Sequence, residues 1–337
     1  MDQLTEIDRD DLPLLKSLYT PDGSKCYVTY TTIDTYIRWF QTDPNIKHIQ
    51  FFCLNGDLSR GTFVVTDRRT AYADTLSECT EELLRLLLLI DYSKGYYFTS
   101  LNDRTASVRE AIKQKNLEIN TDHTSLLYYL PKEKALEFVV QPPEGIELKP
   151  VTKLSDFQKA FAAWFGADSL SSIRLFQRVG KYNPCVGAFL ENETLASWVF
   201  RFLSGLLMAL QTDKDYFGYG YASLVVRAIL KQIAELGHDI TAGVLEVNTP
   251  SRNLFGKLGF KDRNRAYAET LNASHENLSR LLQLIDYSKG YIFLAIRTEI
   301  RPVLKSSLQN ANVEIVSDNE TILYHLPKEE ALKFNVE

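Results

Sequence analysis

Gly218 and Gly220 stand between an apolar run and an amphipathic segment, in the order Gly-Tyr-Gly-Tyr. Two glycines allow the backbone to approach a ligand closely and to direct several N–H groups at it. The N-terminus of a following helix adds partial positive charge, so a pyrophosphate group would bind there. Glycines before a helix also occur as simple turns. On this pair alone, both interpretations stay open.

Two familiar phosphate-binding motifs do not fit these glycines. No Gly-Lys-Ser/Thr follows them, which excludes a P-loop. Ser223 stands where the third glycine of G-x-G-x-x-G is needed, which excludes a dinucleotide fingerprint.

The neighbouring segments predict the elements that position the glycines. Residues 206–211 form an apolar run typical of a short buried strand, and residues 222–236 carry apolar side chains at helical spacing. Residues 240–247 predict a second strand, with Asn248 at its end, and residues 251–258 a short helix that Pro250 starts. Strand, glycine loop, helix, strand and helix is therefore the predicted order.

The residues that follow the glycines make the pattern more specific. Gly-x-Gly at a strand–helix junction, followed by a strand, Asn-x-Pro-Ser and Phe-Gly-Lys-Leu-Gly-Phe at 255–260, resembles the Gcn5-related N-acetyltransferase (GNAT) superfamily. Within it, residues 182–187, 196–198 and 204–205 resemble the glycine N-acyltransferase-like branch, whose members carry a degenerate N-terminal domain of similar fold. The resemblance covers residues 144–260 and, less closely, the N-terminal domain. It does not extend to the C-terminal tail.

The resemblance implies an acyl-CoA-dependent N-acyltransferase that acts on a small amine or amino acid, with a glycine-like acceptor and no metal. The pantetheine arm would lie along a gap between two parallel strands, and the pyrophosphate would sit on the loop amides. The implied cofactor-binding residues are Leu207, Met208, Ala209, Leu210, Gln211, Phe217, Gly218, Tyr219, Gly220, Tyr221, Ala222 and Asn248. In the reaction an amine attacks a thioester, while a base takes its proton and a polar group stabilises the oxyanion and the thiolate.

Three positions depart from the superfamily's pattern. Phe255 stands where many relatives have a tyrosine acid, and residues 204–206 lack the branch's glutamate base. Asp215 stands where Arg or Gln is usual, so we expect weaker CoA affinity, because a carboxylate repels a pyrophosphate. The alternative function is therefore a catalytically weak or inactive relative that serves as a CoA- or protein-binding module.

Two residues are candidates to replace the missing base and acid, and each has two possible interpretations. Glu246 is a candidate base acting through water, or a solvated glutamate. Ser251 is a candidate hydroxyl near the thiolate, or a helix cap. Trp198 and Phe200 either line the acyl pocket or belong to the core.

Composition sets the broad class. The chain has 337 residues, 45% hydrophobic and 24% charged, and a net charge of −5 with no basic cluster, so we expect no nucleic-acid partner. The acidic start argues against a secretory or mitochondrial leader, and the longest apolar run is too short to cross a membrane. The four cysteines have no C-x-x-C spacing, which favours reduced thiols. A cytoplasmic protein is the expectation, with the oligomeric state left open.

The chain is predicted to divide at a Pro/Gly break at 141–145. Residues 67–138 and 262–334 repeat one another, and both contain Leu-Ile-Asp-Tyr-Ser-Lys-Gly-Tyr. The predicted fold class is α/β (α+β), with tandem GNAT-like mixed-sheet domains and a C-terminal duplicated half-domain. We assign 1–141 to a degenerate GNAT-like domain, 146–262 to the acyl-CoA-binding domain and 263–337 to the duplicated copy.

The duplicated unit repeats only the second half of the N-terminal domain, so alone it would leave sheet edges uncovered. We therefore expect it to dock on, or complete the sheet of, a neighbouring domain. The last strand of the catalytic sheet is predicted from residues 263–271.

Overall fold

A computed structural model describes residues 2–20, 26–93, 95–117, 119–164 and 173–272, and three short strands further on. The first half of the chain contains β1 (Leu4–Glu6), α1 (Leu12–Leu18), α2 (Tyr27–Thr42), β2 (Ile49–Leu54), β3 (Phe63–Asp67), β4 (Thr70–Asp74), α3 (Glu81–Leu89), β5 (Tyr96–Leu101), α4 (Asn102–Gln114), β6 (Ile119–Leu130) and α5 (Lys132–Leu136). The second half contains β7 (Ile146–Lys149), α6 (Leu154–Ala162), α7 (Ile173–Tyr182), β8 (Cys185–Leu190), β9 (Leu195–Arg201), β10 (Leu206–Thr212), α8 (Tyr221–Glu235), β11 (Ile240–Leu245), α9 (Thr249–Lys257) and β12 (Lys261–Asn272).

The two halves repeat one arrangement. In the first, β1 to β4 pair antiparallel and β5 lies parallel to β4. In the second, β7 to β10 pair antiparallel and β11 lies parallel to β10. All twelve strands form one mixed sheet in the order β1-β2-β3-β4-β5-β12-β6-β11-β10-β9-β8-β7. The predicted fold class, a tandem of mixed α/β units, is confirmed.

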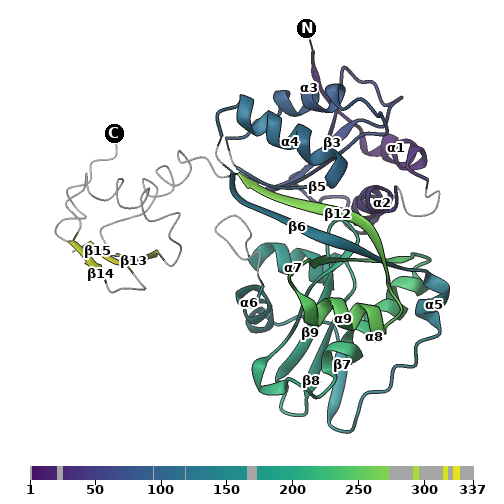
Figure 1. Cartoon of the computed structure of the whole chain (residues 1–337), viewed down its shortest axis with the longest axis vertical. Coiled ribbons are helices and arrows are strands. Elements are labelled where there is room, and N and C mark those ends of the chain that lie inside the picture. The colour runs from purple at the N-terminus through teal and green to yellow at the C-terminus, as the bar shows by residue number, and fades with distance from the viewer. Residues whose placement is uncertain are drawn as a thin grey trace.

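The two long strands in the middle of the sheet are exchanged between the halves (Figure 1). Ile240–Leu245 of β11 pair with Leu130–Ser125 of β6, a strand of the first half. Tyr267–Asn272 of β12 pair with Leu101–Tyr96 of β5. The prediction that residues 263–271 finish the second half's sheet is therefore corrected: β6 takes the place beside β11, and β12 lies beyond it. The sequence boundaries at 141–146 and 262–263 stay a prediction.

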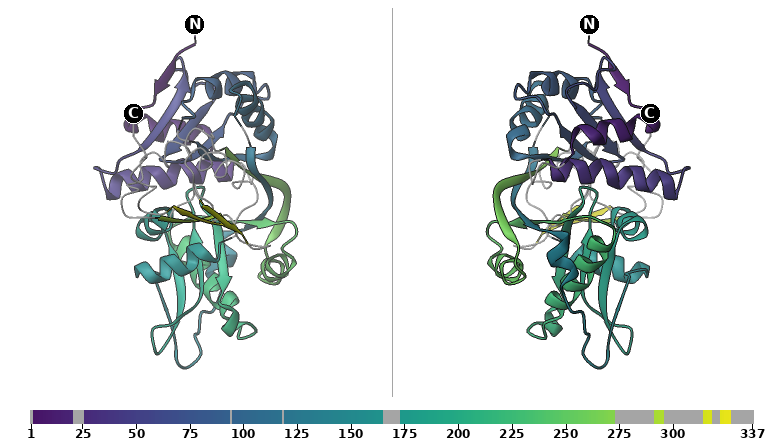
Figure 2. Two further views of the ribbon diagram at one scale, coloured as in Figure 1. Left: turned by 90° about the vertical axis from the view of Figure 1, so that its left-hand side faces the viewer. Right: turned by 90° about the vertical axis from the view of Figure 1, so that its right-hand side faces the viewer.

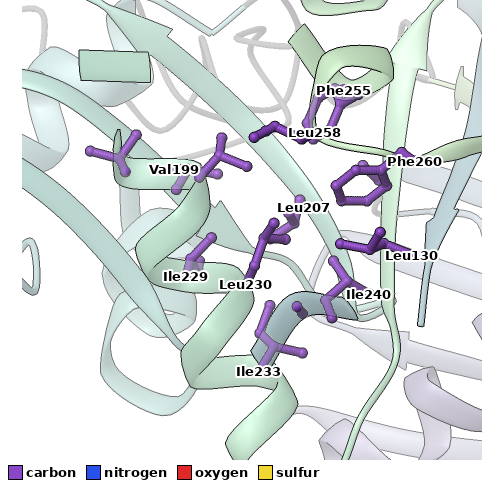
Figure 3. Close-up of a cluster of buried hydrophobic side chains, with 14 of the residues drawn as sticks. Leu130, Val199, Leu207, Ile229, Leu230, Ile233, Ile240, Phe255, Leu258 and Phe260 are labelled. Atoms are coloured by element: carbon purple, nitrogen blue, oxygen red, sulfur yellow. The ribbon is translucent and has the colours of Figure 1, made fainter. Parts of the chain in front are cut away.

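Helices cover both faces of the sheet in each half (Figure 2). In the first half, α1 and α2 pack on one face, and α3 and α4 pack on the other. In the second half, α6 and α7 pack on one face, and α5, α8 and α9 on the other. This last core includes Leu130 from β6 with Ile240, Phe255 and Phe260 (Figure 3). The exchanged strand is thus part of the second half's core.

Helix α2 joins the halves through polar contacts. The Trp39 indole Nε1 donates a hydrogen bond to Asn183 Oδ1 at 2.8 Å, and Asn183 Nδ2 donates to the carbonyls of Arg201 and Phe202 at 3.0 and 3.2 Å. Thr31 Oγ1 donates to the Ser204 carbonyl at 2.9 Å. Asn183 is only 6% exposed, so its three hydrogen bonds fix α2 against the β9–β10 turn.

Asn183→Ala is expected to destabilise the chain by about 3 kcal/mol, because it leaves a buried indole N–H and two carbonyls without partners. Urea unfolding of the full chain measures the loss. Asn45→Ala, at an exposed position, is the matched control and should change the unfolding free energy by less than about 0.5 kcal/mol. A loss below about 1 kcal/mol for Asn183→Ala would show that this contact does not hold the halves together.

The described strands of the duplicated tail belong to two different sheets. Its first strand, within β12, joins the large sheet as expected. The strands β13 (Tyr291–Ala295), β14 (Glu314–Ser317) and β15 (Ile322–Leu326) form a separate antiparallel sheet in the order β13-β15-β14. For these three strands the expectation of completing a neighbour's sheet is wrong. The other residues of the tail lie outside the described ranges.

Two smaller features complete the fold. No disulfide joins any of Cys26, Cys53, Cys79 and Cys185, all of which lie in the described part of the chain. None of the helices described here combines the length and the apolar character that crossing a membrane requires.

Candidate functional site

A cleft of about 780 Å³, measured with its opening to solvent, lies where β10 and β11 separate. The two strands pair only at Leu206–Thr241 and Leu207–Ala242 and then diverge. Residues 207–211 of β10 line one side, and Gly243, Val244 and Leu245 of β11 line the other. The predicted gap between two parallel strands is therefore present, and all five strand residues expected along the pantetheine arm border it.

A β-bulge in β10 opens the cleft. Pairing with β9 runs through Met208–Phe200 and resumes at Gln211–Trp198, so Ala209 and Leu210 are skipped. Ala209 has φ of 52°, an uncommon conformation for a residue with a side chain. A bulge turns backbone groups out of the ladder. Ala209 and Leu210 therefore leave the ladder with β9 at the point where β10 borders the cleft.

The glycine loop follows β10 and leads into α8. Gly218 and Gly220 have φ of 84° and 81°, and a methyl group built on either would meet no atom within 4 Å. Gly220 is the N-cap of α8, and no side chain caps that end. The first N–H groups of Tyr221 and Ala222 therefore point outward without intrahelical partners. This geometry suits an anion at the helix N-terminus.

Aromatic side chains surround the loop. Phe217 and Tyr219 are 62% and 67% exposed. The Tyr219 and Tyr221 rings stack on one another, with centroids 5.6 Å apart and planes 20° apart. The two tyrosine rings thus pack together, while Tyr219 stays largely exposed to solvent.

Asn248 and Ser251 meet at the start of α9. Asn248 is the N-cap, and its Oδ1 accepts a hydrogen bond from the Ser251 backbone N–H at 3.1 Å. Both residues line the cleft. The cap is therefore Asn248 rather than Ser251, and the capping interpretation of the Ser251 side chain is wrong. Its hydroxyl is left for another partner.

The structure does not bring Glu246 into the cleft. Glu246 is exposed and absent from the lining, and its backbone carbonyl accepts a hydrogen bond from Arg252 Nη1 at 3.2 Å. Phe255, where a tyrosine acid was expected, is buried and lines the cleft beside the Tyr128 ring, at 6.1 Å between centroids. The polar side chains lining the cleft are Ser125, Gln211, Asn248 and Ser251.

Charges near the loop are mostly compensated. Asp213 Oδ2 lies 2.5 Å from Lys159 Nζ, and this hydrogen bond lowers the pKa of the Asp213 carboxyl. Asp215 is exposed on the short turn before the glycines, and its backbone N–H donates to Asp213 Oδ1 at 3.1 Å. The Asp215 carboxylate is therefore the nearest uncompensated negative charge in the loop's own sequence, and water can solvate it.

Sequence reasoning missed part of the lining. Ser125 reaches the cleft from β6, and Ala160, Ala163 and Trp164 reach it from α6 and its C-terminal end. Trp198 and Phe200 are at most 1% exposed and belong to the core under α6 and α7, which settles their two interpretations in favour of the core. No local motif marks Ser125, because its place depends on the strand exchange.

Among the described residues, no three His, Cys, Asp or Glu side chains are grouped as a metal ion would require. The described groups that a ligand would meet in the cleft and at the loop are backbone amides, hydroxyls and apolar side chains.

Comparison with known proteins agrees with this geometry. Residues 185–268, from β8 into β12, match the model of a family described as FR47-like protein. No curated protein is significantly similar to the chain.

Several solved structures are similar. A Drosophila protein is 18% identical over 80% of this chain and 99% of its own, with a TM-score of 0.70. A putative acetyltransferase from Pyrococcus horikoshii is 13% identical over 81% of this chain and 90% of its own, with a TM-score of 0.50. A tandem GNAT protein from the clavulanic acid biosynthesis pathway is 13% identical over 81% and 98%, with a TM-score of 0.48. The family match covers part of the second half, and the Drosophila protein shares the fold over most of the chain.

Proposed function

We propose that the chain is an acyl-CoA-dependent N-acyltransferase that transfers an acyl group to a small amine or amino acid. The cleft between β10 and β11 carries this proposal, because it is open where the strands diverge and is bordered by bulged backbone. The pantetheine arm would lie along residues 207–211, where Ala209 and Leu210 leave the ladder, and the pyrophosphate would bind the amides of residues 217–222. A glycine-like acceptor, and membership of the glycine N-acyltransferase-like branch, rest on the resemblance of the motifs.

The residues of the site could stabilise the oxyanion and the thiolate, but they offer no base for the amine proton. Backbone amides near Ala209 would stabilise the oxyanion, and the Ser125 and Ser251 hydroxyls, which line the cleft, could donate to the departing thiolate. The described lining contains no carboxylate or imidazole to take the amine proton. We infer that the acceptor enters as the neutral amine.

Glu246→Gln is therefore expected to change kcat by less than about twofold, since the inference gives Glu246 no proton to take. Below the pKa of the acceptor's ammonium group, kcat/KM should rise about tenfold per pH unit, because only the neutral amine attacks. Thiol release from acetyl-CoA and benzoyl-CoA with a panel of amino acids, from pH 6 to 10, measures both. A loss of about 100-fold or more for Glu246→Gln, with CoA binding unchanged, would identify Glu246 as a base acting through water.

The second candidate, a CoA- or protein-binding module without turnover, is favoured by the same lack of an acid–base pair in the cleft. Calorimetric titration with acetyl-CoA, done beside the thiol assay, separates the two functions. Binding without thiol release at any pH would favour the module. No binding would contradict both.

A further inference from the structure

A second cavity, of about 470 Å³ with its opening, lies between the two halves beside the cleft. Its walls come from α2, β4 and β5 of the first half, and from α7 and the β9–β10 turn of the second. Trp164 and Met208 line both this cavity and the cleft. Met208 directly precedes the bulged Ala209, so the cavity adjoins the cleft where the thioester would lie.

The chemistry of the walls is apolar. Among the residues that the structure describes, no charged side chain lines the cavity. The hydroxyls of Thr32, Thr70 and Thr99 donate to the carbonyls of Val28, Asp67 and Ala71, at 2.8, 2.9 and 3.1 Å. These three donors are already used within the protein, and the Tyr72 hydroxyl lies 2.7 Å from Thr29 Oγ1. The lining also includes Tyr36, Tyr97 and Ser204, which carry hydroxyls, and the rest of it is methyl groups and aromatic rings.

This lining distinguishes between the two substrates of the reaction, the amine acceptor and the acyl donor. An amino acid acceptor carries a carboxylate group even when its amine is neutral, and burying that carboxylate without a charged partner is costly. An acyl chain is apolar beyond its carbonyl and gains free energy from the same walls. The cavity therefore suits the acyl group rather than the acceptor.

We propose that this cavity holds the acyl chain of the donor, so that the first half of the chain selects acyl groups longer than acetyl for the site in the second half. The proposal rests on the proposed acyl-CoA function. It assigns α2, β4 and β5 a direct role at the site, which makes the two halves one binding unit.

The test is equilibrium binding of CoA, acetyl-CoA and hexanoyl-CoA to the full chain by calorimetry. Each buried methylene is expected to tighten binding by up to about fourfold, so hexanoyl-CoA should bind at least about tenfold more tightly than acetyl-CoA. Leu175 of α7 lines the cavity and is only partly buried, so Leu175→Trp fills the space at little cost to the core. It should reduce the hexanoyl preference to about twofold or less and leave CoA affinity unchanged.

Leu154→Trp is the matched control, because Leu154 is 53% exposed and lines neither cavity. It should keep the native preference. Leu175→Ala should instead favour octanoyl-CoA over hexanoyl-CoA, because it lengthens the space. If CoA binds but chain length has no effect, or if Leu175→Trp keeps the preference, the acyl chain lies elsewhere and this inference fails alone. If none of the three compounds binds, the proposed function fails with it.

Discussion

Gly220→Ala is expected to weaken CoA binding at least about tenfold, whereas Gly237→Ala should leave it unchanged. Gly220 begins α8 with φ of 81°, and Gly237 follows the same helix with φ of 85°. A methyl group at either would meet no atom of the chain within 4 Å. Both substitutions therefore cost about the same in backbone strain, about 1–2 kcal/mol. Only the methyl group at Gly220 would occupy the space in which a pyrophosphate must approach the amides.

Calorimetric titration with CoA and urea unfolding, carried out on both variants, separate binding from stability. Similar losses of unfolding free energy, with lost affinity only for Gly220→Ala, would place the phosphate at this loop. Equal CoA affinity for both variants and the native chain would show that the glycine loop is a simple turn.

The elements around this loop could be predicted because their signals are local. The apolar run before the glycines became β10, and the amphipathic segment after them became α8, within one or two residues of the expected ends. Gly218 and Gly220 adopt the positive φ values that favour glycine, so the residue type itself carried the information. The gap between β10 and β11 was expected from the resemblance of the motifs, and the cleft lies there.

The remaining features depend on contacts between distant segments. The sequence of a strand says little about which strand will pair with it, because the backbone N–H and C=O groups that form the pairing are the same at every residue except proline. Residues 125–130 of β6 pair with β11, and residues 119–129 pair with β12, so this one strand lies between two strands of the second half. Ser125 and the shared cavity could not be located without that pairing. Strand periodicity alone leaves Trp198 and Phe200 as either acyl-pocket or core residues, and the structure places both in the core.

A fragment of residues 142–272 is expected not to fold, because it lacks β6. Strand β11 would lose its partner over Ile240–Leu245, and the core under α8 would lose Tyr128 and Leu130. Burying two such side chains contributes about 3–6 kcal/mol, and unpaired backbone groups add to the loss. That sum is comparable with the whole stability of a domain, about 5–15 kcal/mol. Circular dichroism and urea unfolding of the purified fragment measure the outcome.

A fragment of residues 115–272 is the matched comparison, since it restores β6 and α5 but still lacks β1 to β5. It should unfold cooperatively and bind CoA, although without the first half it should not prefer hexanoyl-CoA. The opposing outcome has a definite physical basis: β12 could move into the vacant place beside β11, as exchanged strands do when their partner is removed. Cooperative unfolding and full CoA affinity of the 142–272 fragment would reveal that rearrangement. Two pairings, with either β6 or β12 beside β11, would then have similar free energies. In that case β6 would determine which pairing forms and would add little to the free energy of unfolding.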